Sequence, residues 1–234
     1  MSSGKITLEQ RKASLHYHVQ KYRKRRVIID TDAACEADDP FAIAQALMSK
    51  MLEVKGICAE HFVAEGSMEQ SYEMICRVTE AMGADVPVLR GQTGKMSEHQ
   101  GEPMTEAAQF IIEETMKEDD KPLFVLCIGA VTNVAEAIRA KSEIVDRMTV
   151  VCIGGNPIGC EKPGWEFNFG NDVEAANTVL HCGGDIWILE KYNDGSLLMA
   201  RSADYCTKIS YRFMKQKTPR GRRERAGRLE TPRR

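Results

Sequence analysis

The feature that most constrains this chain is an apolar run that ends in a cluster of acids, at residues 27–40. The run begins with Val27, Ile28 and Ile29, and an apolar run bounded by polar residues is typical of a buried strand. Pro40 and the Ala/Ile/Leu pattern after it predict the opening of a helix. The acids therefore lie on a strand-to-helix loop. In an open α/β sheet that loop stands at the carboxyl end of a strand, where ligands bind.

Five acids fall within ten residues at this loop: Asp30, Asp32, Glu36, Asp38 and Asp39. Carboxylates this close repel one another and raise one another's pKa unless positive charge holds them. No other group nearby in the sequence balances the charge, so a hard cation such as Ca²⁺ or Mg²⁺, which takes oxygen ligands, is expected there. The alternative is that Asp39 only caps the helix, as Asp before a proline does well, and that the other acids are solvated.

Length and composition bound the remaining possibilities. With 234 residues and 43% hydrophobic content, the chain can bury a sizeable core as one domain or a large part of one. No apolar run reaches about 18 residues and no signal-like stretch opens the chain, so a cytoplasmic protein without a membrane partner is expected. The eight cysteines form no CxxC pair, and several fall in apolar runs, as reduced core thiols do.

The net charge of −2 conceals an uneven distribution. Residues 1–26 carry eight Lys and Arg against one acid, and residues 215–234 carry nine against two, which leaves 15 basic and 31 acidic residues between them. The expected division is a basic N-terminal arm (1–26), an α/β domain (27–214) and a basic, disordered tail (215–234). Neither end forms a readable nucleic-acid-binding module, so no nucleic-acid partner is expected.

Strand-like and helix-like segments alternate along the domain. Strand candidates lie at residues 54–58, 86–89, 123–128, 148–153 and 185–189, and helical patterns follow Pro40, occupy 67–82 and 105–117, and end at Leu180. This alternation predicts an α/β fold, an open, mostly parallel sheet with helices on both faces and a Rossmann-like core. Gly129 permits a tight turn after the strand at 123–128, and Thr132 is expected to cap the next helix.

Polar residues at two other places extend the predicted site. His61 follows the second strand and would share the sheet edge with the acids, although a lone His in a loop is more often packed or simply exposed. Glu166 and Asn168 alternate on what reads as an extended segment, which would place both side chains on one face and Phe167 on the other. A carboxylate beside an amide can bind a vicinal diol, since sugar hydroxyls need both acceptors and donors. The alternative is a polar edge strand with one buried aromatic.

Taken together, these motifs resemble the inosine-uridine nucleoside hydrolases. The similar stretches, in the family's order from about residue 26 to about 190, are Asp30-Thr-Asp32 with Asp38-Asp39, Ile128-Gly-Ala-Val-Thr-Asn133, Ile153-Gly-Gly155, and Glu166-Phe-Asn168 with Asn171-Asp-Val-Glu-Ala-Ala176. The resemblance implies a Ca²⁺-dependent enzyme that hydrolyses the N-glycosidic bond of a small-molecule ribonucleoside, giving ribose and a free base. It also suggests a homo-oligomer.

The resemblance implies that three residues hold the metal. Asp32 would ligate calcium and act as general base on the water that the metal activates. Asp39 would be a second ligand, and Ile128 would offer its main-chain carbonyl. Asp30 would not bind the metal itself and would support these ligands.

By the same resemblance, Asp38, Glu166 and Asn168 would bind the ribose hydroxyls. His61 is a candidate contact to the ribose or the base. Bond cleavage makes the sugar oxocarbenium-like, so carboxylates beneath the ring would stabilise the developing positive charge.

Two features depart from the family pattern. The five residues 33–37 separate Asp32 from the Asp38-Asp39 pair, more than is usual, so the loop must bulge or the acids sit differently. Family members are also longer and carry near the C-terminus a further calcium-ligating Asp, often with a neighbouring His. Here no His follows residue 190, and Asp194 and Asp204 lack the matching context. A C-terminally short or truncated member with an incomplete calcium shell is therefore expected.

Two other functions remain open on the sequence. Asp30-Thr-Asp32 after a strand also suits the aspartyl pair of a haloacid-dehalogenase-like phosphatase, but the later Lys and acidic pair of that class are absent and Glu166-Phe-Asn168 is left unexplained. Loss of the C-terminal ligand would alternatively leave a non-catalytic ribose- or nucleoside-binding protein. Phosphatase activity with Mg²⁺, or nucleoside binding without turnover, would distinguish these from a hydrolase.

Overall fold

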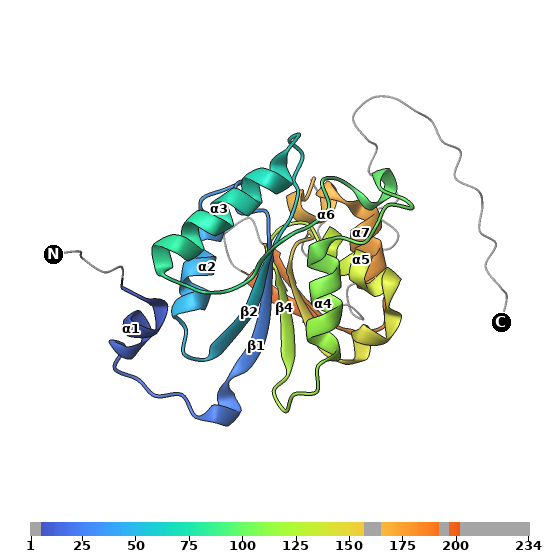
Figure 1. Cartoon of the computed structure of the whole chain (residues 1–234). Helices are drawn as coiled ribbons and strands as arrows, with labels where there is room; N and C mark the ends of the chain where they lie inside the picture. The colour runs from blue at the N-terminus through green and yellow to red at the C-terminus, as the bar shows by residue number, and fades with distance from the viewer. Residues whose placement is uncertain (1–5, 157–164, 192–196, 202–234) are drawn as a thin grey trace, which may run out of the picture.

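A seven-stranded sheet organises the chain (Figure 1). The computed structural model describes residues 6–156, 165–191 and 197–201. The strands are β1 (Arg25–Thr31), β2 (Leu52–Ala59), β3 (Val88–Arg90), β4 (Leu123–Cys127), β5 (Met148–Ile153), β6 (Asp185–Lys191) and β7 (Leu197–Arg201). Their order is β3-β2-β1-β4-β5-β6-β7, and every neighbouring pair is parallel except β6 with β7. The predicted open, mostly parallel α/β sheet is confirmed.

The strand order reverses at β1. This strand pairs with β2 on one side and with β4 on the other, so the connections on its two sides run in opposite directions. A crevice opens at the carboxyl end of a parallel sheet where the order reverses in this way, and it is the usual ligand site of such folds. The carboxyl ends of the strands point upwards in Figure 1.

Helices cover both faces of the sheet (Figure 1). On one face pack α1 (Leu8–Ala13), α2 (Asp38–Met48) and α3 (Ser67–Met82); on the other pack α4 (Glu106–Met116), α5 (Thr132–Ala140) and α7 (Val173–Leu180). Successive residues of β1 serve opposite faces, since Ile28 belongs to the α4/α5/α7 core and Ile29 to the α2/α3 core. A short helix, α6 (Phe167–Asn171), and three 3₁₀ helices (Lys21–Arg23, Met96–Glu98, Ser142–Asp146) complete the described elements.

Most element bounds follow the sequence pattern. The helix at 67–82 and the strand at 148–153 have the predicted limits, and Gly83 ends α3 in the left-handed conformation at φ 66°. The strands β2 and β6 are longer than predicted, and β3 begins two residues later. The strand β7, which pairs antiparallel with β6, was not predicted.

Two predicted helix starts are wrong. The helix α2 begins at Asp38, before Pro40, and its N-cap is Ala37, which makes no side-chain cap. Pro40 is tolerated there because the amide groups of a first helical turn need no partner within the helix. Thr132 does not cap α5 but is its first residue, after Val131, because its hydroxyl bonds to side chains from other elements.

The N-terminal segment folds back onto the sheet domain. Thr7 caps α1 with a capping box, and Leu8 is buried with the α2/α3 core. The Lys50 ammonium donates to the carbonyls of Leu15 (2.7 Å) and Tyr17 (2.9 Å), which ties this segment to the end of α2. The division into arm, domain and tail stays a prediction, and the tail at 215–234 lies outside the described residues.

A buried ion pair lies at the amino end of β1. Arg26 and Glu114 are each 3% exposed, and the guanidinium lies 2.7 Å from the Glu114 carboxylate and 3.6 Å from that of Asp119. Lys117 reaches the other Glu114 oxygen at 2.5 Å. Burial alone would raise the pKa of Glu114, but the hydrogen bonds from Lys117 and Arg26 outweigh it and lower that pKa.

Candidate functional site

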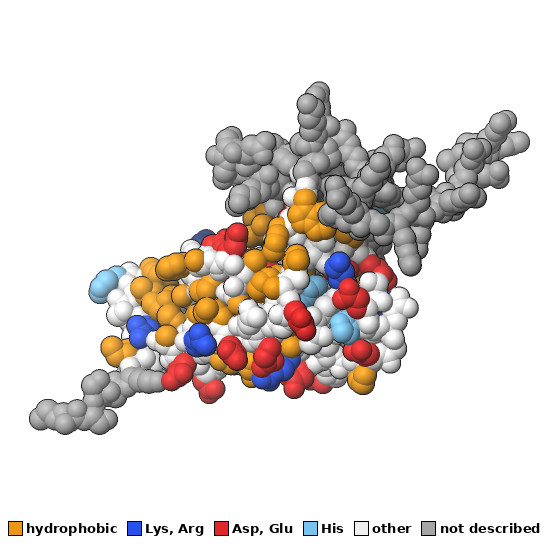
Figure 2. All heavy atoms as spheres, turned by 90° about the horizontal axis from the view of Figure 1, so that it is seen from above, with side chains coloured by type: hydrophobic (Ala, Val, Ile, Leu, Met, Phe, Trp, Pro, Cys, Tyr) orange, Lys and Arg blue, Asp and Glu red, His pale blue; other side chains and the backbone are white. Residues whose placement is uncertain are grey.

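An open cavity of about 630 Å³ lies at the carboxyl ends of β1, β4 and β5 and is bounded by α6. Its lining, here called the acid cavity, consists of Asp32, Cys35, Glu36, Asp38, Asp39, Ala42, Ile128, Ile153, Gly154, Gly155, Asn156, Trp165, Glu166, Phe167 and Asn168. Six predicted site residues are brought together here: Asp32, Asp38, Asp39, Ile128, Glu166 and Asn168. Figure 2 shows this end of the molecule from above, with acidic and hydrophobic side chains on the face outside the grey residues.

Asp32 is the most enclosed acid of the cavity wall. It is 2% exposed, and its Oδ2 oxygen has no hydrogen-bond partner within the described residues. Burial first, and then repulsion by Asp39, raise its pKa to about 7. Gly129 packs against it so closely that a Cβ there would lie 2.7 Å from Asp32 Oδ1 and 2.8 Å from its backbone nitrogen. The carboxylate is therefore confined by the turn after β4.

Asp39 stands beside Asp32 on the first turn of α2. It is 7% exposed, and the buried Thr31 hydroxyl donates a hydrogen bond to it. Burial raises the pKa of Asp39 to about 6, opposed by the Thr31 bond and assisted by the charge of Asp38. Asp39 is thus neither a helix cap nor solvated, which excludes the simpler alternative for this acid. Asp38, one residue earlier, is exposed at the cavity mouth.

Glu166 and Asn168 reach the cavity from a helix start, and the predicted extended segment is wrong. Glu166 is the N-cap of α6 and accepts hydrogen bonds from the backbone nitrogens of Asn168 (3.0 Å) and Phe169 (2.8 Å). Asn168 donates its side-chain amide to the carbonyls of Ile153 (2.8 Å) and Ile128 (3.3 Å). The helix forms because Glu166 satisfies its first amide groups, and it still places both side chains on the cavity.

Asp30 lies behind the cavity and is not part of its lining. It is fully buried, and Asn133 donates its amide to Asp30 Oδ1 at 2.9 Å. Burial raises the pKa of Asp30 to about 7, against the opposing effect of hydrogen bonds with Asn133 and Glu60. This position agrees with a supporting role behind the acids that line the cavity.

His61 is not brought to the acid cavity. It is 3% exposed and lines a neighbouring cavity of about 530 Å³, here called the His61 cavity. Its Nε2 lies 2.9 Å from the Thr132 hydroxyl, which donates in turn to Asp172 Oδ2 at 3.1 Å. Trp165 lines both cavities.

Two buried polar residues behind the site were not predicted. Glu60 accepts the Asn133 backbone amide at 2.8 Å and is fully buried, which raises its pKa. Asn133 also accepts the Gln92 backbone amide at 3.1 Å, so it joins the ends of three strands. An acid directly after the apolar residues Ile57–Ala59 was the available signal for Glu60.

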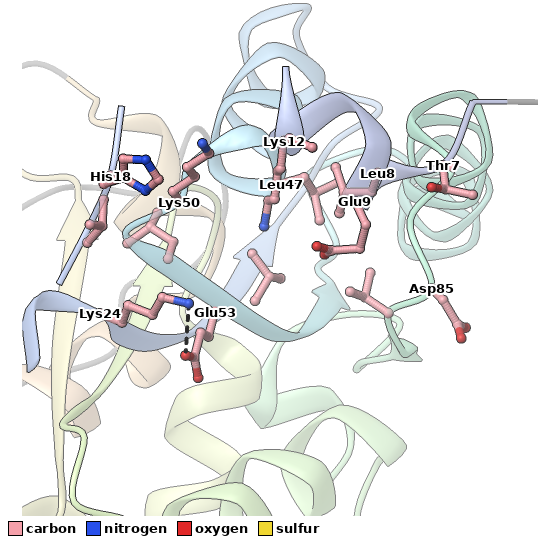
Figure 3. Close-up of a pocket in the computed structure, with 16 residues that line it drawn as sticks. Thr7, Leu8, Glu9, Lys12, His18, Lys24, Leu47, Lys50, Glu53 and Asp85 are labelled. Carbon is pink, nitrogen blue, oxygen red and sulfur yellow. Dashed lines mark ion pairs between the residues drawn. The ribbon is translucent and has the colours of Figure 1, made fainter. Parts of the chain in front are cut away.

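A third cavity, of about 780 Å³, lies at the opposite side of the fold under the N-terminal segment (Figure 3). Figure 3 shows Leu8 and Leu47 among its lining residues, together with lysines and acids, and marks the ion pair between Lys24 and Glu53, which are 4.0 Å apart. Basic and acidic side chains are mixed there, and none of the predicted site residues lines it. It therefore adds nothing to the chemistry of the acid cavity.

Known proteins match the part of the chain that forms this site. The family described as "Inosine-uridine preferring nucleoside hydrolase" matches residues 27–194, which span the acid cluster and the Glu166 helix. The chain belongs to this nucleoside hydrolase family. The family assignment confirms the resemblance seen in the motifs.

Two curated relatives of this chain are both named non-specific ribonucleoside hydrolase RihC. The protein from Klebsiella pneumoniae (strain 342) is 29% identical, over 68% of this chain and 59% of its own length. The protein from Salmonella enteritidis PT4 is 28% identical, over 68% of this chain and 58% of its own. The chain thus spans under two thirds of the length of these relatives.

Solved structures show the same fold. An inosine-guanosine nucleoside hydrolase has a TM-score of 0.58 at 25% identity, over 70% of this chain and 59% of that one. A purine-preferring ribonucleoside hydrolase from Gardnerella vaginalis has a TM-score of 0.59 at 25% identity, over 70% of this chain and 60% of that one.

Within the residues that the structure describes, no helix is long and apolar enough to cross a membrane.

The oxygen atoms of the acid cavity suit a hard cation. Asp32 and Asp39 place two buried carboxylates side by side with raised pKa values, and one Asp32 oxygen lacks a partner within the described residues. The main-chain carbonyl of Ile128 adds a third oxygen, although Asn168 also bonds to it. No group of three His, Cys, Asp or Glu side chains in the described segments forms a metal site by itself. Water and substrate hydroxyls would have to supply further ligands, as calcium takes about six to eight.

Proposed function

We propose that this chain hydrolyses the N-glycosidic bond of ribonucleosides to ribose and free base. The observation that carries the proposal is Asp32, a buried carboxylate with one oxygen that has no partner in the described segments, in a cavity that also presents Asp38, Glu166 and Asn168. The family match and the names of the curated relatives support the same activity.

The proposed metal is Ca²⁺, with Asp32, Asp39 and the Ile128 carbonyl as its ligands in this chain. When bound, the cation supplies positive charge that offsets the crowded acids and lowers the pKa of a nearby water. The Thr31 hydroxyl bond to Asp39 leaves that carboxylate one oxygen for the metal. Asp30 supports the loop from behind, through Asn133.

Asp32 is the proposed general base. In the metal-free protein its pKa is raised to about 7, and a bound cation would lower this pKa, so that the carboxylate is ionised at neutral pH and can accept a proton from attacking water. The Gly129 turn confines the carboxylate, so its orientation is fixed before substrate binds. Removal of such a base typically costs a factor of about 10² to 10⁴ in rate.

Asp38, Glu166 and Asn168 are the proposed ribose contacts. Asn168 uses its amide nitrogen on two carbonyls, which leaves its amide oxygen to accept from a sugar hydroxyl. Asp38 is exposed at the mouth and can accept from a second hydroxyl. Negative carboxylates around the sugar would stabilise an oxocarbenium-like transition state.

Calcium titration calorimetry on chelator-stripped protein tests the proposal, beside Asp39→Asn and, as a control, the exposed Asp146→Asn. The expected result is binding by wild type and control and none by Asp39→Asn, with ribose released from inosine and uridine in a reducing-sugar assay. Binding without ribose release would identify a non-catalytic nucleoside-binding protein. Absence of calcium binding would overturn the metal assignment.

The cytoplasmic location, a role in nucleoside salvage, the homo-oligomer and the lack of nucleic-acid and membrane partners stay predictions.

A further inference from the structure

A buried glutamate behind the acid cavity has no part in the proposed chemistry. Glu60 comes directly after β2 and is fully buried. Its backbone amide donates to the Thr31 carbonyl at 2.8 Å, so β2 stays bonded to β1 up to the point where the acids of the loop begin. A buried carboxyl group is costly unless hydrogen bonds or opposite charge compensate it, so the contacts of Glu60 indicate its role.

One oxygen of Glu60 supports the start of α5. Its Oε1 accepts the backbone amide of Asn133, the second residue of that helix, at 2.8 Å. The first amide groups of a helix have no partner within the helix, and the N-cap of α5, Val131, makes no side-chain cap. Glu60 therefore does the work of a capping residue from the end of another strand.

Asn133 also connects Glu60 to Asp30. The Asn133 side-chain amide donates to Asp30 Oδ1 at 2.9 Å and to the Ala59 carbonyl at 3.1 Å. The carboxyl groups of Asp30 and Glu60 hydrogen bond to each other, and Asp30 Oδ2 receives no bond from an N–H or hydroxyl group of the described residues. Ionised carboxylates only accept hydrogen bonds, so a bond between these two requires a proton on one of them.

The groups around Glu60 favour a proton on Glu60 itself. Among the described residues, the side chains that share its electrostatic surroundings are three acids and two thiols: Asp30, Asp32, Asp172, Cys58 and Cys127. His61, whose backbone amide lies 3.3 Å from Glu60 Oε2, has its pKa lowered by burial and adds no positive charge. Burial first, and then the charge of Asp30, raise the pKa of Glu60 well above its ordinary value, whereas the Glu60 bond lowers that of Asp30. Glu60 is thus the donor and Asp30 the acceptor.

The contacts of Glu60 extend to two of the proposed metal ligands. The helix α5 begins just after the turn that follows β4, and Gly129 of that turn confines Asp32. The Ile128 backbone amide donates to the Asp30 backbone carbonyl at 2.9 Å, which fixes Ile128 against β1. Because Glu60 holds both the first turn of α5 and the Asp30 side chain, its loss would loosen Asp32 and Ile128 together.

We propose that Glu60 is a positioning residue that acts as a neutral carboxylic acid, donating to Asp30 and holding the first turn of α5 behind the acid cavity. The inference rests on the proposed function, because the groups that Glu60 positions are the proposed metal ligands. A neutral Glu60 also adds no negative charge to a region that is already crowded with acids.

Infrared spectroscopy tests the protonation of Glu60 separately from any activity. At pH 8, Asp30 and Asp32, whose pKa values are about 7, are mostly ionised, whereas Glu60 should stay protonated. Wild type should therefore show the C=O stretch of a protonated carboxyl group, and Glu60→Gln should lack it. Glu114→Gln, which changes a buried but ion-paired glutamate, should keep the band. A wild-type spectrum without the band, or a band that survives in Glu60→Gln, would overturn the proposal.

Calcium calorimetry and ribose release test the positioning role. Glu60→Gln keeps an acceptor for Asn133 and a donor for Asp30, so its calcium affinity and kcat should be close to those of wild type. Glu60→Leu removes both bonds, and loss of a hydrogen bond to a charged group should lower calcium affinity about tenfold. The kcat for uridine should fall by a similar factor with little change in KM, because the proposed ribose contacts are untouched.

Two outcomes of these measurements would overturn the positioning role. One is a folded Glu60→Leu variant with the calcium affinity of wild type. The other is weakened calcium binding by Glu60→Gln, since that result would mean that the site needs an ionised Glu60; this measurement decides the matter even if Glu60→Leu does not fold. If wild type releases no ribose while the infrared band and the calcium affinities behave as expected, the proposed hydrolysis fails and the role of Glu60 stands.

Discussion

Both ends of β1 carry buried charged residues. Opposite charges are paired at the amino end, whereas only acids meet at the carboxyl end. At the amino end, Arg26 meets Glu114 at 2.7 Å, and the pKa of that acid is lowered. At the carboxyl end, Asp30 and Asp32 are as deeply buried, and their pKa values rise to about 7. One strand thus has an end where buried charge is balanced by opposite charge and an end where it is not balanced within the described residues. Unpaired buried charge of this kind is concentrated at functional sites.

Breaking the compensated end should have the largest effect. Arg26→Met leaves the Glu114 carboxylate buried with only Lys117 as counter-charge, and loss of one partner of a buried pair costs about 3–5 kcal/mol. Urea unfolding should show this loss. The double variant Arg26→Met with Glu114→Met should recover a large part of it. A single variant as stable as wild type would show that the two ends do not differ in this respect.

Removal of the Asp32 charge at the carboxyl end should have the opposite effect and raise the free energy of unfolding. The folded pKa of Asp32, about 7, lies above its ordinary value of 3.8. Between these values the folded protein holds a proton that the unfolded chain has released. The free energy of unfolding of metal-free protein should therefore fall as pH rises through this window, by at most about 1.4 kcal/mol per pH unit for this group.

Asp32→Asn removes the contribution of Asp32 to the slope of unfolding free energy against pH. In chelator at pH 8 the variant should be more stable than wild type by up to about 4 kcal/mol, and with calcium restored its ribose release should be lost. Urea unfolding from pH 4.5 to 8 measures both curves, with the exposed Asp146→Asn as the control variant. An Asp32→Asn slope equal to that of wild type would contradict the assignment of the proton to Asp32.

The smallest effect is expected at Thr31, which lies between Asp30 and Asp32 at the carboxyl end of β1. Thr31→Val removes the hydroxyl bond that lowers the pKa of Asp39, so this pKa should rise above about 6. One such hydrogen bond is worth about 1 kcal/mol, which predicts calcium affinity about fivefold weaker near pH 6.5. Calorimetry measures it, with Thr149→Val as the matched control, since that hydroxyl donates to Asp185 away from the cavity. Equal affinities would show that the Thr31 bond does not support the site.

The fold was predictable because strand and helix periods are local properties of the sequence. The run at 148–153 and the helix at 67–82 required no knowledge of their partners. The positions of Asp32, Asp38 and Asp39 at one cavity were also predictable, because acids that follow a buried strand directly must lie together at its carboxyl end. Metal ligation, general-base and ribose-binding roles stay predictions.

What could not be predicted depends on contacts between distant segments. Glu166 and Asn168 form a helix start instead of an extended segment because the Glu166 carboxylate accepts the backbone amides that follow it. His61 faces its own cavity because Thr132 and Asp172, far along the chain, orient its ring. Asp194 and Asp204, considered for the missing calcium ligand, lie outside the described residues.

The strand order also bears on how the domain is assembled during synthesis. Among the described strands β1 is made first yet lies in the middle of the sheet, and β4 and α6, which complete the acid cavity, come much later. At about 5–20 residues per second, Asp30 and Asp32 stand on an open strand edge for many seconds. Charges on such an edge discourage pairing with other chains. The acids of the cavity would thus also discourage aggregation of the nascent chain.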